Sequence, residues 1–519
     1  MKINMKVVNK IIFNTGVLYV KIILCVFISL WSVPLVLHAL GASDYGLYNL
    51  IAGVISMLSF LNASMTLSLQ RFMSITMGEG DYDKLNLIYN TGILLHFFLG
   101  LLLVLFLEFS SVFIFDGFLN VPLERIETAK TIFQYLIFSV FFTILSVPFD
   151  AVLNANENML VYSIISIFEA LLKLCIAFSL SWFYGDKLIF YGMGILCIVI
   201  LVSIIKFLYV YYKYKELKLA IVKNFSKASF KDMLGFIGWG TLGSGAIVSR
   251  NQGIAILLNQ FYGTVVNAAY GIANQVSGVM SFFSSSLQKS LNPQLMKSEG
   301  MGNRERVLKF AFISSKYSVL LLAIVSIPLI IYLPYIFKLW LSEVPKYTII
   351  FTRLVLVLAL LGQFSVGPQA AIQSVGKVKN YFVIISLIIF LGLPISWCAL
   401  RYTSQPEIVL LIFIGLEVCL LFIRLFFAAS LTGLSIMLFL KEVVFPTSLV
   451  VIISILCSYL VSILLNQSIG SFIFVVIVNT LLFFLFAYFI SFSNEERKFI
   501  IKIFIYLRNQ ILNFVNKAL

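Results

Sequence analysis

Stretches of about 20 apolar residues recur from one end of this 519-residue chain to the other, and they limit the fold more than any other feature. Each stretch is long enough to cross a bilayer core of about 30 Å. They do not alternate between apolar and polar residues, as the strands of a membrane β-barrel would. Only 11% of the residues are charged, whereas a soluble domain has about 25%. The chain is therefore predicted to be an all-α polytopic membrane protein.

The hydropathy pattern predicts about fourteen transmembrane helices. The first is expected to be an uncleaved helix, because its apolar run is too long for a signal peptide and no A-x-A site follows it. The predicted spans are residues 11–39, 46–69, 88–114, 131–150, 159–183, 188–212, 234–259, 264–287, 307–333, 348–369, 381–400, 408–430, 444–465 and 471–492.

The distribution of Lys and Arg predicts the orientation. If the N-terminus is cytoplasmic, the loops and tails on that side hold 23 of the 37 basic residues, the opposite side holds six and the spans hold eight. Both termini are therefore predicted to be cytoplasmic, in agreement with an even number of spans. The net charge of +15 follows from this topology, so we expect no nucleic-acid partner.

The chain also repeats itself. The residues Tyr45-Gly46-Leu47-x-Asn49 return as Tyr270-Gly271-Ile272-x-Asn274, at an offset of 225. A second block near Pro148 returns near Pro368, at an offset of 220. One repeat is thus six spans long, which predicts two six-helix lobes related by a pseudo-two-fold axis along the membrane normal, plus two C-terminal helices.

These patterns predict five regions. We expect an N-terminal lobe at 1–212, a basic cytoplasmic linker at 213–233, a C-terminal lobe at 234–431, two extra helices at 432–493 and a basic amphipathic tail at 494–519.

The sequence offers little for catalysis. It contains no G-x-x-x-x-G-K-[ST] loop, and its two histidines lie in apolar settings. The six cysteines also fall in apolar spans, with no metal-ligand spacing. We therefore predict no catalytic residue, no metal and no cofactor, and these absences favour transport over an enzymatic activity.

Basic residues inside the predicted spans are the strongest functional signal, because a cation in hydrocarbon costs about 3 kcal/mol or more. Those near a membrane face are expected to reach water along the surface: Lys206, Lys309 and Arg353. Two more have a carboxylate on the same helix face, and each pair could be structural or could couple transport to an ion: Glu169 with Lys173, and Glu417 with Arg424. Lys316 has no obvious local partner and stays a candidate for either role.

Lys21 and Arg250 differ from the others because the repeat places them on equivalent helices. Subtracting 225 from 250 gives 25, which is one turn from Lys21. No carboxylate lies within one turn of either residue in its own span. We predict that these two cations, together with Lys316, bind an anionic group of the substrate in a central cavity. The alternative is that each neutralises a carboxylate on another helix.

Several segments resemble bacterial polysaccharide-export flippases, the O-antigen and capsule repeat-unit flippases of the superfamily that includes the multidrug and toxin extruders. The resemblance covers essentially the whole chain, and the segments that carry it are Leu40-Gly41-Ala42-Ser43-Asp44-Tyr45-Gly46-Leu47-Tyr48, Tyr262-Gly263-x-x-Val266-Asn267-Ala268-Ala269-Tyr270, Leu339-Trp340-Leu341 and Ala371-x-x-x-x-Gly376-Lys377.

The resemblance implies a flippase that moves an undecaprenyl-diphosphate-linked oligosaccharide from the inner to the outer leaflet of the bacterial cytoplasmic membrane by alternating access, with ion coupling. Membrane lipids, a glycan polymerase and the chain-length machinery are the partners expected. A multidrug or cation extruder of the same superfamily is the alternative, and a membrane-embedded glycosyl or acyl transferase is a more distant one.

Overall fold

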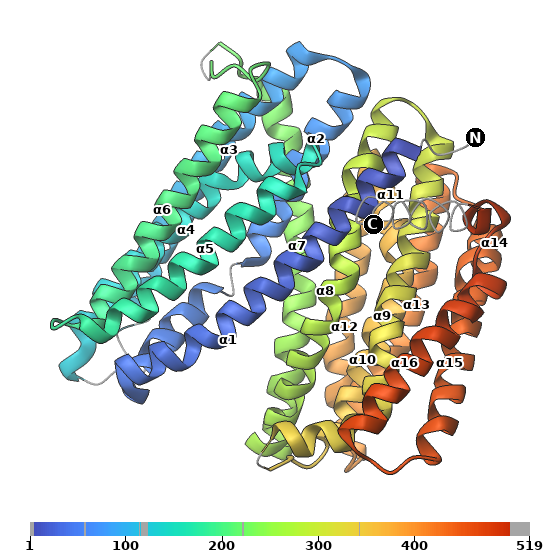
Figure 1. Ribbon diagram of the computed structural model, residues 1–519. Helices are drawn as coiled ribbons and strands as arrows, with labels where there is room; N and C mark the ends of the chain where they lie inside the picture. The colour runs from blue at the N-terminus through green and yellow to red at the C-terminus, as the bar shows by residue number, and fades with distance from the viewer. Residues whose placement is uncertain are drawn as a thin grey trace, which may run out of the picture. The chain divides into compact units, whose positions relative to one another are not determined.

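The fold is all-α, as predicted. The structure is a computed structural model that describes residues 5–56, 59–113, 115, 123–220, 223–341 and 343–498, and these ranges contain helices and no strands (Figure 1). The α-helices are α1 (Met5–Ser56), α2 (Ser59–Glu79), α3 (Tyr82–Phe113), α4 (Ile126–Ala155), α5 (Met159–Ser179), α6 (Lys187–Lys213), α7 (Lys227–Tyr262), α8 (Thr264–Gly300), α9 (Arg304–Trp340), α10 (Thr348–Phe364), α11 (Val366–Val375), α12 (Lys379–Tyr402), α13 (Ile408–Thr432), α14 (Ile436–Phe439), α15 (Phe445–Ile463) and α16 (Ile469–Phe486).

Four short helical turns complete the described elements. Two are 3₁₀ turns next to α4 and α5, η2 (Leu123–Arg125) and η3 (Leu180–Trp182). Two are π-helical turns next to α15 and α16, η4 (Leu440–Val444) and η5 (Ala487–Ser491).

Helices occupy every predicted span, but not all of them are apolar enough to cross a membrane by composition alone. Within the described ranges, ten helical segments pass that test, and an eleventh is added if α10 and α11, which bend by 42° at their junction, form one span. The helices α2, α7 and α8 are absent from this set. Their polar residues suit helices that pack against other helices or line water rather than face lipid.

The chain packs as two compact units, which do not follow the order of the sequence. Unit 1 consists of Met1–Gln252, Ser286–Phe310 and Ala370–Leu391. Unit 2 consists of Gly253–Ser285, Ala311–Gln369 and Gly392–Leu519. The ends of α8, α9, α11 and α12 that are predicted to lie on the cytoplasmic side therefore belong to unit 1 with the first six spans. The five regions predicted from the sequence stay a prediction.

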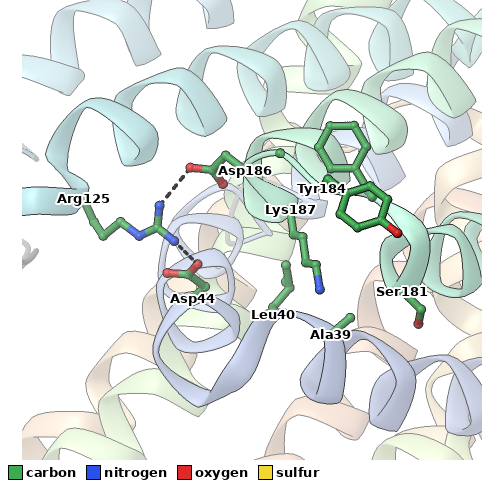
Figure 2. A pocket seen from close by; sticks show the side chains of 10 residues that line it. Ala39, Leu40, Asp44, Arg125, Ser181, Tyr184, Asp186 and Lys187 are labelled. Carbon is green, nitrogen blue, oxygen red and sulfur yellow. Dashed lines mark hydrogen bonds and ion pairs between the residues drawn. The ribbon is translucent and has the colours of Figure 1, made fainter.

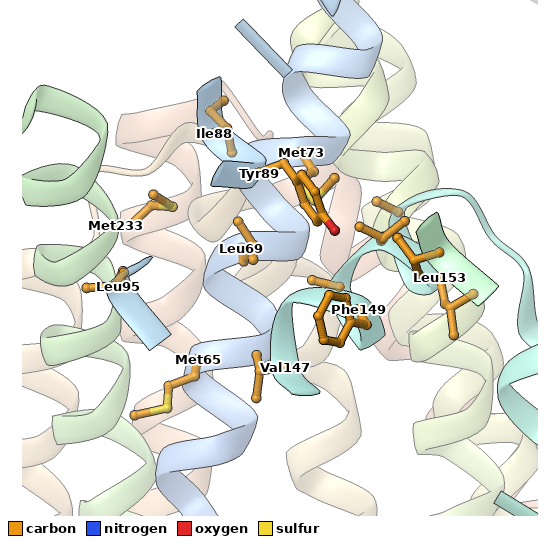
Figure 3. Packing of buried hydrophobic residues seen from close by; sticks show 14 of the residues in the cluster. Met65, Leu69, Met73, Ile88, Tyr89, Leu95, Val147, Phe149, Leu153 and Met233 are labelled. Atoms are coloured by element: carbon orange, nitrogen blue, oxygen red, sulfur yellow. The ribbon is translucent and has the colours of Figure 1, made fainter. Parts of the chain in front are cut away.

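The core of unit 1 is built around α4, which contacts α2, α3 and α6. Buried side chains of α2, α3, α4 and α7 interdigitate there, including Leu69, Tyr89, Phe149 and Met233 (Figure 3). Gly92 on α3 lies directly against the Leu69 side chain, so a larger residue would overlap it. Val161 and Tyr162 at the start of α5 pack against this core, which fixes the position of α5 in the site described below.

Unit 2 contains the two C-terminal helices α15 and α16, which contact each other. Asn479 on α16 is fully buried, accepts a hydrogen bond from Ser458 on α15 at 3.0 Å and donates to the Ile324 carbonyl of α9 at 3.1 Å. The extra helices are thus held to unit 2 by a buried polar contact as well as by apolar packing. Of the predicted tail at 494–519, residues 494–498 are helical and the rest lies outside the described residues.

The first predicted loop is a bend rather than a break. Gly41 has φ 77° and ψ 166°, a conformation open essentially to glycine alone. It ends the first span and redirects the chain into a second helical stretch that runs to Ser56.

Candidate functional site

Two lysines from distant helices lie over one aromatic ring in unit 1. The Lys289 Nζ of α8 is 3.4 Å from the centroid of the Tyr162 ring, and the Lys21 Nζ of α1 is 4.6 Å from it. Tyr162 lies on α5 and is partly buried against the core of unit 1. A cation this close to a tyrosine face is attracted by the ring. The ring therefore attracts two positive charges from different helices without neutralising either.

A buried carboxylate lies at the predicted cytoplasmic end of the same helices. Glu157, in the turn between α4 and α5, accepts hydrogen bonds from Lys297 Nζ at 2.5 Å and from Gln294 Nε2 at 2.7 Å, both on α8. Lys10 Nζ on α1 is 3.4 Å from the same carboxylate. Burial raises the pKa of Glu157, but Lys297, Gln294 and Lys10 together outweigh it, and the pKa is lowered from its usual value. Glu157 is therefore an ionised, fully satisfied carboxylate.

The Tyr162 cluster and the Glu157 cluster use the same three segments. Along α1, Lys10 and Lys21 are eleven residues apart, about three helical turns. Along α8, Lys289 and Lys297 are eight residues apart, about two turns. These spacings place each pair of lysines on one face of its helix. Two basic clusters thus follow one another along α1 and α8.

Each of the three predicted cavity cations has its own contacts in the structure. Lys21 joins Lys289 at Tyr162, a partner that the sequence did not suggest. Arg250 on α7 donates from Nε to Asn251 at 3.3 Å. Lys316 on α9 belongs to unit 2, where it is buried and donates to Glu496 and to the Ser491 carbonyl, both at 3.0 Å. Lys316 is therefore engaged by the segment that follows α16.

The two predicted carboxylate pairs are both present. Lys173 lies 2.7 Å from Glu169 on α5, and both side chains are partly exposed. Arg424 lies 2.5 Å from Glu417 on α13, and both are buried. Arg424 also donates to Ser365 at 2.8 Å. The second pair is a buried network, whereas the first is not.

Two cations placed near a membrane face by the sequence have partners instead. Lys206 is 2.9 Å from Asp150, with little of either side chain exposed, so the prediction that Lys206 merely reaches water was wrong. Arg71, two residues beyond the predicted end of the second span at 69, lies within α2 and is buried. It donates to the carbonyls of Gln373 and Ser374 at 2.6 and 3.0 Å, at the C-terminal end of α11. An arginine there satisfies carbonyls that the helix leaves unpaired.

The Asp44 segment after the first span has a structural role at the opposite end of unit 1. Arg125 forms ion pairs with Asp44 and with Asp186, the latter at 2.8 Å (Figure 2). Asp186 also accepts from the backbone N–H groups of Leu188 and Ile189 and so caps α6. The pocket beside this cluster has a volume of about 440 Å³ and includes Tyr184 and Lys187. Arg125 thus ties together the bend after the first span, the start of α4 and the start of α6.

Sequence reasoning missed Lys289, Tyr162 and Glu157. The predicted eighth span ended at residue 287, which left Lys289 in a loop, whereas α8 continues to Gly300. One signal was available: Gly78-x-Gly80 returns as Gly300-x-Gly302 at an offset of 222, close to the offset of the longer repeat. That match would have placed the end of the eighth helix at residue 300.

Comparisons with known proteins agree with this fold. Residues 18–179 match the MatE family model. The uncharacterized membrane protein EpsK of Bacillus subtilis is 22% identical over 304 residues, which cover 58% of this chain and 59% of that protein. The matched part is thus less than two thirds of this relative.

Solved structures cover more of the chain. An outward-facing multidrug resistance transporter of the MATE family aligns with a TM-score of 0.72 at 13% identity, over 82% of this chain and 95% of that one. A MOP superfamily transporter from Pyrococcus furiosus, described as having a binding pocket of reverse polarity that suggests a different function, aligns with a TM-score of 0.71 at 12% identity, over 82% and 95%. At such low sequence identity, the structural likeness establishes the fold alone. With ten or eleven helical segments apolar enough to cross a membrane in the described ranges, and with the family match at residues 18–179, this chain has the composition of a multi-pass membrane protein and the fold of the MATE transporter structures.

Proposed function

We propose that this chain is a flippase that moves an undecaprenyl-diphosphate-linked oligosaccharide from the inner to the outer leaflet of the bacterial cytoplasmic membrane by alternating access. The observation that carries the proposal is the pair Lys21 and Lys289 over the Tyr162 ring. Among the described residues, no ion pair joins either ammonium group to a carboxylate, so the positive charge is left uncompensated for an incoming anion. A diphosphate supplies such an anion, and lysines bind phosphate oxygens through charge-assisted hydrogen bonds.

Three acidic residues in and near the spans argue against a cation extruder, whereas a fourth, Glu108 on α3, accepts a hydrogen bond from the neutral Gln134 amide at 2.9 Å. Such a transporter needs uncompensated carboxylates to attract cationic drugs. Glu169, Glu417 and Asp150 each lie 2.5–2.9 Å from a lysine or arginine nitrogen. The reverse polarity described for the Pyrococcus furiosus protein supports the view that this fold accommodates substrates of different charge.

Arg250 is proposed as a third contact for the diphosphate, on the basis of its equivalence to the Lys21 helix in the internal repeat. Lys316 is left out, because Glu496 already engages it. Glu169 and Glu417 are proposed to couple transport to an ion, and replacing either by glutamine tests this through the dependence of transport on a pH gradient.

Translocation of an undecaprenyl-diphosphate-linked oligosaccharide in proteoliposomes tests the proposal. Lys21→Ala and Lys289→Ala should each reduce the rate by about ten-fold or more, the usual loss when a charge-assisted hydrogen bond is removed. Lys130→Ala is the matched control, because Lys130 forms an exposed pair with Glu127. Unchanged translocation in both variants would refute the role of the lysine pair. Export of a cationic drug without lipid translocation would favour the extruder.

A further inference from the structure

Glu157 contacts Lys10 and Lys297 at the ends of α1 and α8 that are predicted to be cytoplasmic, and its backbone conformation costs energy. Its φ is +59°, in the left-handed region that non-glycine residues seldom adopt. Such conformations persist only where surrounding contacts enforce them, and they concentrate at functional sites. Here the contacts are the hydrogen bonds from Lys297 and Gln294, together with Asn14, which donates to the Glu157 carbonyl at 3.0 Å.

A further basic side chain, Arg306, orients the Gln294 amide that donates to Glu157. Gln294 accepts a hydrogen bond from Arg306 at 3.1 Å while its amide donates to Glu157. Lys10 also donates to the carbonyl of Asn156 at 3.3 Å. One carboxylate thus gathers basic groups from α1, α8 and α9.

Helix α8, which carries Lys297, packs closely against α2 at the position of Lys297 itself. Gly78 on α2 lies against the Lys297 carbonyl, and Gly300 on α8 lies against the Ile75 carbonyl, so closely that a Cβ on either glycine would overlap the carbonyl oxygen. The two contacts are equivalent, because Gly300 follows Gly78, and Lys297 follows Ile75, by 222 residues in each case. The crossing of α2 and α8 therefore has the two-fold symmetry of the internal repeat.

An anion that reaches Lys21 and Lys289 from the predicted cytoplasmic side first meets the lysines that Glu157 holds, since both clusters lie on the same faces of α1 and α8. We propose that Glu157 is a tethered anion that keeps this entrance closed by occupying Lys10 and Lys297, and that the diphosphate of the incoming substrate displaces it and opens the α2–α8 crossing. The proposal rests on the flippase function only for the identity of the anion. Displacement of the Glu157 carboxylate requires an anion with more charge and more acceptor oxygens than a carboxylate, which a phosphate group supplies.

The test measures the distance across the α2–α8 crossing by double electron–electron resonance. Spin labels on Tyr82→Cys and Met301→Cys, two exposed positions beside α2 and α8, report it in a protein whose six native cysteines are replaced. The protein is studied in nanodiscs alone, with sodium pyrophosphate and with undecaprenyl diphosphate. The matched control is Glu79→Gln, which breaks an exposed pair with Lys84 at the same end of α2.

The wild type and Glu79→Gln should give a single short distance without an anion. Glu157→Gln should raise the ratio of separated to closed molecules about ten-fold or more, because it removes the charge from a buried pair. Undecaprenyl diphosphate should open the wild type in the same way and add little to Glu157→Gln. A response to pyrophosphate as well would show that the headgroup suffices, whereas a response to the lipid alone would assign the effect to the anchored form.

A closed Glu157→Gln, or a wild type that stays closed with both diphosphates, would overturn the proposal. These results are independent of the translocation assay. If the diphosphates open the crossing but no oligosaccharide is moved, the flippase function fails while the tethered anion stands.

Discussion

Alanine at Gly78 or at Gly300 should force α2 and α8 apart at their predicted cytoplasmic ends. Each glycine lies against a main-chain carbonyl of the other helix, Gly78 against Lys297 and Gly300 against Ile75. A side chain could rotate away from an added methyl group, but a carbonyl inside a helix cannot. The helices must therefore separate or shift as bodies.

The size of the effect follows from the overlap of the added methyl group. Adding a methyl group to a close-packed contact typically costs about 1–3 kcal/mol. The higher helix propensity of alanine stabilises the closed and the separated states equally, because both helices stay intact, so it does not change their ratio. The closed crossing should thus lose about 1–3 kcal/mol relative to the separated state, a factor of about 5–150 in their ratio.

The spin-label distance between positions 82 and 301 measures this ratio directly. Gly271→Ala is the matched control, because Gly271 lies in α8 as well but an added Cβ would meet nothing within 4 Å. The two single variants should resemble each other, since the contacts are equivalent by symmetry. The double variant should fall short of the product of the two effects, because one methyl group already separates the helices. A closed distance in Gly78→Ala and Gly300→Ala, as in the control, would refute the reasoning.

Three further predictions concern single contacts. Arg424→Ala should destabilise the protein by about 3–5 kcal/mol, because it removes the guanidinium that lies 2.5 Å from the buried Glu417 carboxylate, whereas Arg424→Ala with Glu417→Gln should recover much of the loss; thermal unfolding in detergent checks this. Arg71→Lys should lower the thermal midpoint, since one ammonium cannot reproduce the fork that donates to two carbonyls of α11, and a midpoint equal to that of the wild type would contradict this. The pKa of Glu157 is lowered, so its ionised form stabilises the closed crossing at every pH above the ordinary carboxyl pKa. This stabilisation is lost only as the pH falls through the lowered pKa of the folded state. The distance between labels at positions 82 and 301 should therefore stay short down to roughly pH 5, and opening near pH 6 would contradict the assignment.

The helices and their order could be predicted from the sequence because hydropathy and helix length are local properties. Within the described residues, helices lie in every predicted span, including the polar α7 and α8, although α1 and α2 share the span 46–69 and α10 and α11 share the span 348–369. The ends were less accurate where a helix leaves the apolar layer: α8 extends to Gly300, thirteen residues beyond the predicted end at 287. Hydropathy marks where a helix stops being apolar, not where it stops.

Charge pairs within one helix could be predicted from the sequence, whereas charge pairs between helices could not. The pair of Glu169 and Lys173 follows from a spacing of four residues on one helix. By contrast, Lys206 and Asp150 are 56 residues apart, and Lys316 and Glu496 are 180 apart. Nothing in the spacing of such residues encodes their contact, because it depends on how the helices pack. The same holds for Tyr162, because the contact of its ring with two lysines joins residues of three separate helices.

The rate at which an undecaprenyl-diphosphate-linked oligosaccharide crosses the bilayer of proteoliposomes tests the central claim most directly. The wild type should move it, and Lys21→Ala and Lys289→Ala should each move it about ten-fold more slowly or worse, while Lys130→Ala keeps the wild-type rate. Wild-type rates in both lysine variants, or no translocation by the wild type, would contradict the account.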